Sequence, residues 1–425
     1  MRGTRTRRLA IATLTVVASA FALAACGDSG DDNGGTSGGQ QKIRLTWQAG
    51  YDKPVGALIK AFEAKNPNIK VEANFLPIDS YGQVVTTQFQ AGNGPDVVWG
   101  SPGRGNTNAL GLLFNRGWLA PLNDLSFAKS IPEEASAIVH SGPTLYALPV
   151  AVFPIGALYN EKVYDEAKLT TPTTFDQILQ VCKTLKDKGK SAIGIPGQVP
   201  ALFVVGMASN YVYNKIPDWN EQRDTGKVKF ATSPEWKETL NAFKTLNDGG
   251  CFPKGAAAIN IPQAIGRLAN GGSLMSIVPG DASAGISAAN PKTKLGIFPF
   301  PGPTADATHV PISYGQALGL NKSSKHLDAA KKFLEFVAQP EPSKLVAHAM
   351  GVPTIDEFKQ GQLTPVLAGL QDTVKAKQTT AYGALGFPSG DVYDTVNKAT
   401  QGILSGQVSV DEALKMIDTA WDSAK

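Results

Sequence analysis

Apolar positions in the first hundred residues follow two spacings in turn. Runs of apolar residues typical of buried strands are each followed by apolar residues spaced as on one face of a helix. Strands that alternate with helices indicate an α/β architecture with mainly parallel sheet. The predicted strands cover 43–47, 69–76 and 96–99, and the predicted helices open at Pro54 and cover 81–90.

The pattern changes at 146–160, a long apolar stretch broken by Pro149 and Pro154. Such a stretch can be a pair of strands or a crossover between two lobes. A chain of 425 residues is long enough for two or three domains or lobes, at roughly 100–200 residues each. Further strands are predicted at 274–278 and 295–300, and further helices at 175–188, at 234–246 with Ser233 as cap, at 327–337, and after the capping box that starts at Ser409.

The first 25 residues have the pattern of a targeting segment, and we do not expect them to be part of the fold. A basic segment and an apolar segment precede Leu23-Ala24-Ala25-Cys26, and this order is typical of a secretory signal peptide. The motif Leu23-Ala24-Ala25-Cys26 resembles the bacterial lipobox, and this resemblance implies that Cys26 is acylated and becomes the first residue of the mature protein. An ordinary signal peptide with a chance cysteine is the alternative. Residues 26–41 are rich in Gly, Asp and Ser and predict a flexible linker.

The charge balance excludes one class of partner. The chain has 40 basic and 36 acidic side chains, and four of the arginines lie within residues 2–8 of the signal segment. The remainder is therefore formally neutral, because 40 minus 4 equals 36. A neutral body has no general attraction to phosphate backbones, so we expect no nucleic-acid partner.

Two cysteines remain once Cys26 is assigned to the lipid. Cys182 lies on the apolar face of the predicted 175–188 helix, and Cys251 follows a Gly-Gly stop. In an exported chain these two cysteines can form a disulfide. Two buried free thiols are the alternative.

Sequence patterns of catalysis and metal binding are missing. The four histidines have no ligand spacing among them, and the Gly-x-Ser-x-Gly match at 35–39 lies in the linker and not at a strand-to-helix turn. The segment Gly103-Arg104-Gly105 satisfies neither nucleotide-binding pattern. We therefore expect no catalytic residue, no metal and no cofactor, and a binding role in preference to an enzymatic one.

Six landmarks follow one another in order behind the lipobox. They are Trp47 with Gly50-Tyr51-Asp52, Asn93-Gly94-Pro95-Asp96-Val97-Val98, Gly117-Trp118-Leu119-Ala120-Pro121-Leu122, Tyr146-Ala147-Leu148-Pro149 with Leu158-Tyr159-Asn160, Thr171-Pro172-Thr173-Thr174-Phe175, and Tyr314 to Leu320 with Ala329 to Leu334. With these landmarks, residues 42–425 resemble the family 1 extracellular solute-binding proteins of ABC importers, which include the maltodextrin-binding type.

The resemblance implies an α/β fold of the type II periplasmic-binding-protein kind, with two lobes and a ligand cleft between them. Crossing segments are expected near Val152, near Tyr314 and just after Pro353. Lobe 1 would comprise 42–152 and 315–353, and lobe 2 would comprise 153–314 and 354–425.

The same resemblance implies a function. It implies a monomeric, lipid-anchored receptor on the extracytoplasmic face of the cell membrane, which binds a mono- or oligosaccharide and delivers it to the permease subunits of an ABC transporter. The alternatives are a secreted glycan hydrolase and a receptor for a polyamine, a peptide or a phosphate ester. Sugar sites combine polar groups around the ring with aromatic groups on its apolar face.

Loops that follow predicted strands supply the first candidate ligand contacts. Tyr51 and Asp52 follow the first strand, where the family places a polar contact, although Asp52 can instead cap a helix. Ser101 and Arg104 follow the third strand. Arg104 can donate to a ligand hydroxyl, pair with Asp52, or be a plain surface arginine. Asp281 stands where the family often has tryptophan, which suggests a small polar ligand.

The remaining candidates lie at the crossings and near the C-terminus. Phe153 can stack on a sugar or fill the hinge, and Tyr314 and Gln316 belong to the second crossing. Tyr393 lies near an aromatic contact of the family. Three further aromatic residues can form a stacking platform, although packing within a lobe is the favoured interpretation; they are Tyr211, Tyr213 and Trp219.

Overall fold

A computed structural model describes residues 40–424. The predicted signal peptide, Cys26 and nearly all of the predicted linker lie outside these residues. The first strand begins at Gln41, the last residue assigned to the linker.

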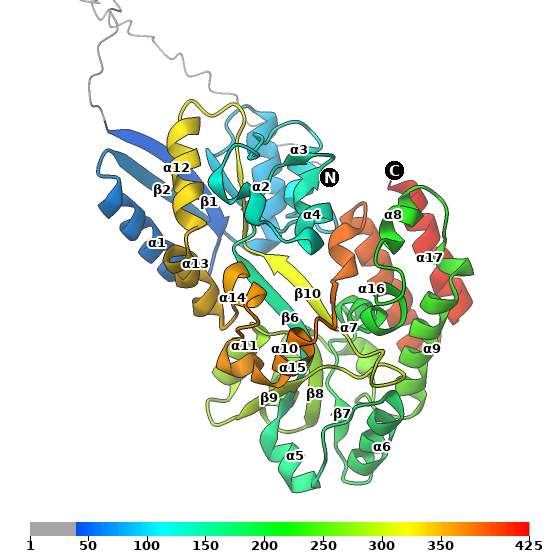
Figure 1. The fold of residues 1–425 in the computed structure, drawn as a ribbon. Helices are drawn as coiled ribbons and strands as arrows, with labels where there is room; N and C mark the ends of the chain where they lie inside the picture. The colour runs from blue at the N-terminus through cyan, green and yellow to red at the C-terminus, as the bar shows by residue number, and fades with distance from the viewer. Residues whose placement is uncertain (1–39, 425) are drawn as a thin grey trace, which may run out of the picture. The chain divides into compact units, whose positions relative to one another are not determined.

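The first of two main sheets has the strand order β11-β3-β1-β2. Its strands β1 and β2 are labelled in Figure 1. The central strand β1 is parallel to both β2 and β3, and β11 is antiparallel to β3. The strands predicted at 43–47, 69–76 and 96–99 are thereby confirmed. The strands are β1 (Gln41–Gln48), β2 (Ile69–Leu76), β3 (Val97–Gly100) and β11 (Ala317–Leu320).

The second sheet has the order β12-β10-β6-β8-β7, and β9 also pairs with β6. The expectation of mainly parallel sheet is wrong here, since β6 is antiparallel to β8, β9 and β10. The chain enters this sheet along β6 and leaves it along β10, which gives these two strands opposite directions. The strands are β6 (Ala151–Asn160), β7 (Ser191–Ile193), β8 (Ser273–Pro279), β9 (Leu295–Phe298), β10 (Val310–Gly315) and β12 (Thr379–Ala381).

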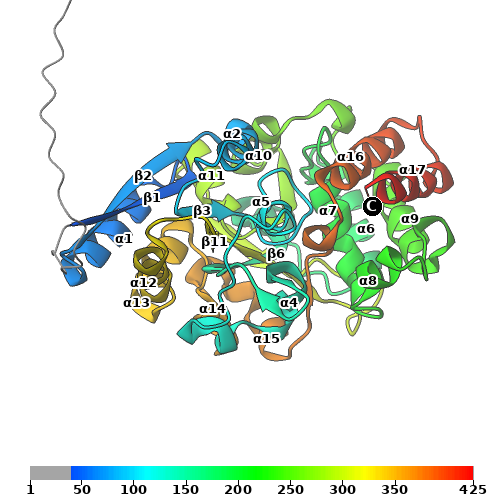
Figure 2. The same ribbon diagram turned by 90° about the horizontal axis from the view of Figure 1, so that it is seen from above.

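Helices surround both sheets, and α9, α16 and α17 pack together near the C-terminus (Figure 2). A short hairpin of β4 (His140–Ser141) and β5 (Thr144–Leu145) follows α4. The helices up to residue 289 are α1 (Asp52–Lys65), α2 (Ile78–Gln90), α3 (Leu110–Phe114), α4 (Glu133–Val139), α5 (Glu161–Ala167), α6 (Phe175–Lys186), α7 (Ala201–Ala208), α8 (Trp219–Asp224), α9 (Pro234–Asp248), α10 (Ile261–Ala269) and α11 (Ala282–Ala289). The later helices are α12 (Leu327–Val337), α13 (Pro340–Ala347), α14 (Ile355–Lys359), α15 (Gln371–Lys375), α16 (Gly390–Ser405) and α17 (Val410–Ser423).

Two predicted helix caps are present. The Ser233 hydroxyl accepts a hydrogen bond from the amide of Trp236 at the start of α9. Ser409 and Glu412 form a reciprocal capping box at the start of α17. Each cap satisfies amide groups that a helix leaves unpaired at its first turn, which is why these helices begin where the sequence predicts.

The segments expected to cross between the lobes lie side by side. Residues 151–154 of β6 pair with β10, and the rest of β6 pairs with β8 and β9. Gln316 is the single residue between β10 and β11, so the chain passes from the second sheet to the first there. The amide of Val152 donates a 3.0 Å hydrogen bond to the carbonyl oxygen of Pro353. The residue bounds of the two lobes remain a prediction.

The predicted disulfide is formed. Cys182 of α6 and Cys251 after α9 are linked, with 4.7 Å between their Cα atoms, and both are buried. The alternative of two free thiols is therefore set aside. The bond closes a long loop within the chain and ties α6 to the end of α9.

None of the helices within residues 40–424 combines the length and the apolar character that a bilayer span requires. The same range contains no group of three or more His, Cys, Asp or Glu side chains that could hold a metal ion.

Candidate functional site

Gln316 is held at the junction of the two sheets by two indole groups. Its Oε1 atom accepts hydrogen bonds from Nε1 of Trp47 at 3.0 Å and from Nε1 of Trp99 at 2.8 Å. Trp47 lies near the carboxyl end of β1, and Trp99 lies near that of β3. Gln316 itself is only 6 % exposed. Since ligands of parallel α/β sheets bind beyond the carboxyl ends of the strands, this junction is a candidate site.

Tyr51 and Asp281 follow strands of the two sheets that Gln316 joins, and we call the three residues the hinge cluster. Tyr51 follows β1, Asp281 follows β8, and Gln316 joins the two sheets. Burial raises the pKa of Tyr51, the charge of Asp281 raises it further, and a hydrogen bond with the Gln316 side chain opposes the rise. Three residues predicted separately as ligand contacts therefore come from both sheets and from the link between them.

Asp281 is a half-buried carboxylate directly before α11. The amide of Gly280 donates to the carbonyl oxygen of Pro154, which fixes the end of β8 against β6. Burial raises the pKa of Asp281 above its ordinary value, while the backbone amides of Asp281 and Ala282 act against that rise. The carboxylate thus lies in surroundings that disfavour its charge.

Phe153 and Tyr314 lie in the paired crossing strands but belong to different faces. Phe153 pairs with Ser313, and its ring packs so closely on Gly315 that a β-carbon at Gly315 would lie 2.6 Å from it. Tyr314 pairs with Val152, and its pKa is raised by burial and by the charge of Glu134. Side chains alternate along a strand, so Phe153 and Tyr314 point to opposite faces of the sheet.

Asp52 and Ser101 have local roles. Asp52 is the first residue of α1, is exposed, and accepts a 3.0 Å hydrogen bond from the amide of Gly50. Ser101 exchanges backbone hydrogen bonds with Asn108 and Leu110, which closes the loop that follows β3. Both residues remain candidate ligand contacts by position only.

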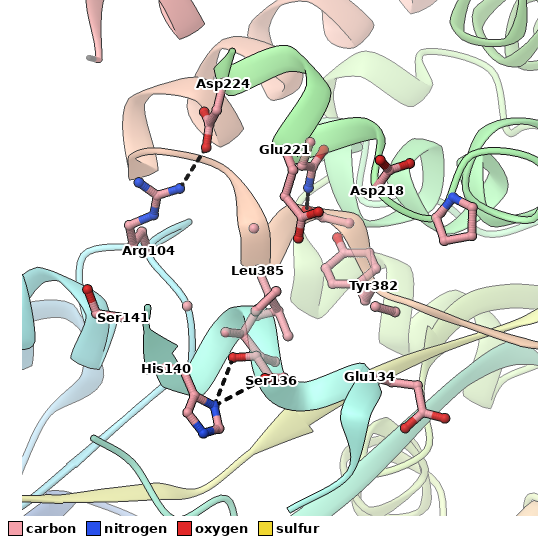
Figure 3. Close-up of a pocket in the computed structure, with 18 of the residues that line it drawn as sticks. Arg104, Glu134, Ser136, His140, Ser141, Asp218, Glu221, Asp224, Tyr382 and Leu385 are labelled. Atoms are coloured by element: carbon pink, nitrogen blue, oxygen red, sulfur yellow. Dashed lines mark hydrogen bonds and ion pairs between the residues drawn. The ribbon is translucent and has the colours of Figure 1, made fainter. Parts of the chain in front are cut away.

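A cavity of about 340 Å³ lies next to this loop (Figure 3). The loop approaches the turn 383–386 closely, because β-carbons at Gly103 and Gly105 would each lie 1.9 Å from a carbonyl oxygen of that turn. This contact is the structural reason for the Gly-Arg-Gly segment that no nucleotide motif explained. The lining includes Arg104, Glu134, His140, Asn220, Asp224 and Tyr382.

Arg104 lines this cavity, and so does Tyr213 of the stacking platform considered above. The Nη2 atom of Arg104 lies 3.1 Å from Oδ2 of Asp224 on α8, so the pairing with Asp52 considered above is wrong. The indole of Trp421 donates a 3.0 Å hydrogen bond to Oδ1 of the same carboxylate. The guanidinium is therefore drawn toward α8 and away from the start of α1.

Tyr393 is connected to the cavity through Tyr382, since their hydroxyl oxygens are 3.4 Å apart. Burial raises the pKa of Tyr393. Tyr213 and Trp219 are almost completely buried, and Trp219 packs edge-on against its aromatic neighbours. Tyr211 is buried in the same way. Packing, the favoured interpretation of these three residues, therefore describes them better than a stacking platform.

The two tryptophans that hold Gln316 were not predicted as part of the site. A buried indole needs an acceptor for its N–H group, and Trp47 and Trp99 both end strands at the edge where ligands bind. Two tryptophans in these positions could have been recognised in the sequence as a sign of a shared buried acceptor. Asp224 gave no such signal, because its partner lies 120 positions away in the sequence.

Comparison with known proteins identifies the family. Residues 46–344 match the family described as bacterial extracellular solute-binding proteins, and this match spans more than half of the chain. The chain belongs to this family. Its members bind solutes and are not enzymes, so this solute-binding protein is not an enzyme either.

Two relatives illustrate how far the similarity extends. The diacetylchitobiose-binding protein DasA of Streptomyces coelicolor is 29 % identical over 376 residues, which cover 84 % of each chain. The multiple sugar-binding protein of Streptococcus mutans is 24 % identical over 334 residues, which cover 74 % of this chain and 76 % of the relative.

Solved structures have the same fold. A chitin oligosaccharide binding protein aligns with a TM-score of 0.74 at 19 % identity, over 91 % of this chain and 99 % of the other. The apo-form of RafE from Streptococcus pneumoniae aligns with a TM-score of 0.72 at 20 % identity, over 92 % of this chain and all of the other. The fold is thus the two-lobe, type II α/β fold that the sequence predicted.

Proposed function

We propose that this solute-binding protein captures a neutral mono- or oligosaccharide at the hinge cluster and delivers it to the permease subunits of an ABC transporter. The observation that carries the proposal is the place of Gln316, which links the two sheets and accepts hydrogen bonds from Trp47 and Trp99 at the carboxyl ends of β1 and β3. Tyr51 and Asp281 follow strands of the first and of the second sheet. A ligand bound there would contact both lobes at once, and closure of two lobes on a ligand is the usual response of such receptors.

The chemistry of the surrounding residues suits a sugar. The hinge cluster offers a hydroxyl, an amide and a carboxylate, and the aromatic ring of Phe153 packs on Gly315, the residue before Gln316. Relatives of this chain are named for saccharides, among them diacetylchitobiose, and melibiose, raffinose and stachyose. These names support a sugar ligand without specifying which sugar.

Anchoring and delivery are further parts of the proposal. Acylation of Cys26 would hold the receptor at the outer face of the cell membrane, and the segment 27–39 would act as its tether. We expect a monomer that works without a cofactor. A polyamine, a peptide or a phosphate ester is the rival ligand class.

Calorimetric titration with a panel of solutes tests the proposal. The panel contains diacetylchitobiose, raffinose, maltotriose, spermidine, a tripeptide and glucose 6-phosphate, and the control protein carries Asp281→Ala. We expect one of the neutral saccharides to bind and the control to bind it about 10- to 100-fold more weakly, because a hydrogen bond to a charged group contributes roughly 1.5–3 kcal/mol. Binding of spermidine, the peptide or the phosphate ester alone would refute a sugar receptor.

A further inference from the structure

Two segments that belong to different sheets touch beside the cavity. The loop 101–109 follows β3 of the first sheet, and the turn 383–386 follows β12 of the second sheet. The amide of Arg104 donates a 3.1 Å hydrogen bond to the carbonyl oxygen of Leu385. A β-carbon at Gly105 would lie 1.9 Å from another carbonyl oxygen of the turn. Main-chain atoms of the two segments are therefore in direct contact.

An ion pair reinforces this contact. Nη2 of Arg104 lies 3.1 Å from Oδ2 of Asp224 on α8, and α8 lies between β7 and β8 of the second sheet in the chain. Figure 3 shows the guanidinium turned toward this carboxylate, and both side chains line the cavity. Arg104 is thus bound to the opposite side of the cavity twice, by its backbone to the turn and by its side chain to α8.

The carboxylate of Asp224 is anchored from behind. The guanidinium of the preceding residue, Arg223, is buried and lies 3.0 Å from Oδ1 of Asp418 and 2.8 Å from Oδ1 of Asp422, both on α17. The indole of Trp421 donates to Asp224 itself at 3.0 Å. Because α8 is held to α17 in this way, Asp224 cannot follow Arg104 if the two sides of the cavity separate.

Arg104 is anchored on its own side as well. The amide of Gly103 donates a 2.6 Å hydrogen bond to the carbonyl oxygen of Ile138 on α4, and the amide of Gly111 donates to the carbonyl oxygen of Gly103 at 2.8 Å. The side chain of Arg104 packs on Gly111, where a β-carbon would lie 2.6 Å from its Cγ atom. Since each partner is fixed to its own side, the ion pair resists separation of the two sides.

We propose that the Arg104–Asp224 ion pair and the contact of the loop 101–109 with the turn 383–386 form a latch, which holds the two lobes together with or without ligand and opens whenever a bound solute is released. The inference rests on the proposed function and deepens it, because it assigns the rate of release to residues that need not touch the ligand. About a third of each side chain in the ion pair is exposed, and such pairs are weak. The latch therefore slows release without preventing it.

The first test needs no ligand. Hydrogen–deuterium exchange is followed by mass spectrometry in peptides that contain 101–109 and 383–386, in the wild type, in Arg104→Gln and in Lys237→Gln. Lys237→Gln is the matched control, because it also removes one positive charge and an exposed ion pair, with Asp411, but that pair joins α9 to α17, which pack together. We expect both peptides to exchange roughly twofold to fivefold faster in Arg104→Gln only. Unchanged exchange in Arg104→Gln would overturn the latch.

The second test measures how fast the ligand leaves. Stopped-flow tryptophan fluorescence follows the release of whichever of diacetylchitobiose, raffinose and maltotriose binds. We expect Arg104→Gln, Asp224→Asn and the double variant each to release it roughly twofold to fivefold faster, and by the same factor, because all three break one contact. Lys237→Gln should behave as the wild type. High salt should speed release from the wild type and not from Arg104→Gln, since salt screens the ion pair.

A direct ligand contact of Arg104 would give a different result. Arg104→Gln alone would then speed release, while Asp224→Asn, which leaves the guanidinium free to reach the ligand, would not. That outcome would overturn the latch, and so would effects that add in the double variant.

Gly105→Ala tests the backbone contact and leaves the ion pair in place. The added β-carbon would collide with the turn 383–386, whereas Gly56→Ala on α1 places it in open space. We expect Gly105→Ala to release the ligand faster and to exchange faster in the 383–386 peptide, and Gly56→Ala to do neither. Wild-type behaviour of Gly105→Ala in both measurements would overturn the proposal.

The two proposals fail in different ways. If no saccharide binds, the proposed function is rejected, while the latch is still judged by the exchange of the ligand-free protein. If a saccharide binds and leaves all variants at the wild-type rate, the latch is overturned and the proposed function stands.

Discussion

Arg104 lies 3.1 Å from Asp224, and this ion pair connects the loop after β3 with α8. The second oxygen of Asp224 accepts from Trp421, so one carboxylate serves two partners. About a third of each side chain in the ion pair is exposed, which places the pair in the class of weak surface interactions.

Asp224→Asn and Asp224→Ala separate the two contributions. The amide of Asn keeps an acceptor for the indole of Trp421 and loses the ionic contact with Arg104, so the free energy of unfolding should fall by less than about 1 kcal/mol. Ala removes both partners and should cost roughly 1–3 kcal/mol more, because a buried donor is left unsatisfied. Urea denaturation measures both values. Equal losses would show that the indole hydrogen bond contributes nothing.

Asp281 should make ligand binding depend on pH. A ligand hydroxyl donates to the ionised carboxylate, and burial has raised the pKa of that carboxyl in the free protein. Affinity should therefore be full above the raised pKa and fall as the pH falls through it, by up to about tenfold per pH unit. Titration calorimetry between pH 4 and pH 8 measures this. Asp281→Asn should bind weakly with no such dependence, and a wild-type profile as flat as that of the variant would contradict the assignment.

The same carboxyl group should make the stability of the ligand-free protein depend on pH in the opposite direction. A folded-state pKa above the unfolded value means that the folded protein binds more protons in the interval between them, so stability falls as the pH rises through that interval. Asp281→Asn should remove this fall. Thermal unfolding of both proteins over the same pH range provides the comparison.

Removal of the disulfide should destabilise the fold substantially. Cys182 and Cys251 are 69 positions apart, and in the chain-entropy model a loop of that size corresponds to roughly 4 kcal/mol. The double variant with alanine at both positions should lose about this amount of unfolding free energy. Reductant should destabilise the wild type and leave the double variant unaffected. A double variant as stable as the oxidised wild type would show that the bond adds no stability.

Cys26→Ser tests the anchor. If Cys26 carries the lipid, the variant should appear in the culture medium while the wild type stays with the membrane fraction. Immunoblotting of both fractions distinguishes the outcomes. Membrane retention of the variant would exclude a lipid anchor at this residue.

Local pattern and helix chemistry predicted part of the fold, namely the strands β1, β2, β3, β8 and β9 and the helices α1, α2, α6, α9, α12 and α17. The caps at Ser233 and Ser409 and the apolar face that carries Cys182 depend on residues a few positions apart, and periodicity reports such relations directly. The direction of β6 relative to its neighbours was not predictable in this way. It depends on the route of the chain between two sheets, which no local pattern encodes.

Some residues of the candidate site could also be predicted from local pattern, and others could not. Tyr51, Gln316 and Asp281 could be named from their places after strands and at a crossing, and the structure places them after strands of the two sheets and at the link between them. The partner of Arg104 could not be named from the sequence, because several aspartates were equally plausible partners. The roles of all these residues in ligand binding remain predictions.

The place of β11 in the first sheet sets an order of events during synthesis. β11 comes from the last third of the chain, yet Leu318 pairs with Trp99 of β3. Until β11 has left the ribosome, β3 has an unpaired edge, and Trp47 and Trp99 have no Gln316 to accept their indole hydrogens. Pairings between such distant residues form slowly. The first sheet therefore cannot be completed before residues 317–320 have been made, so its three N-terminal strands depend on a segment that is synthesised much later.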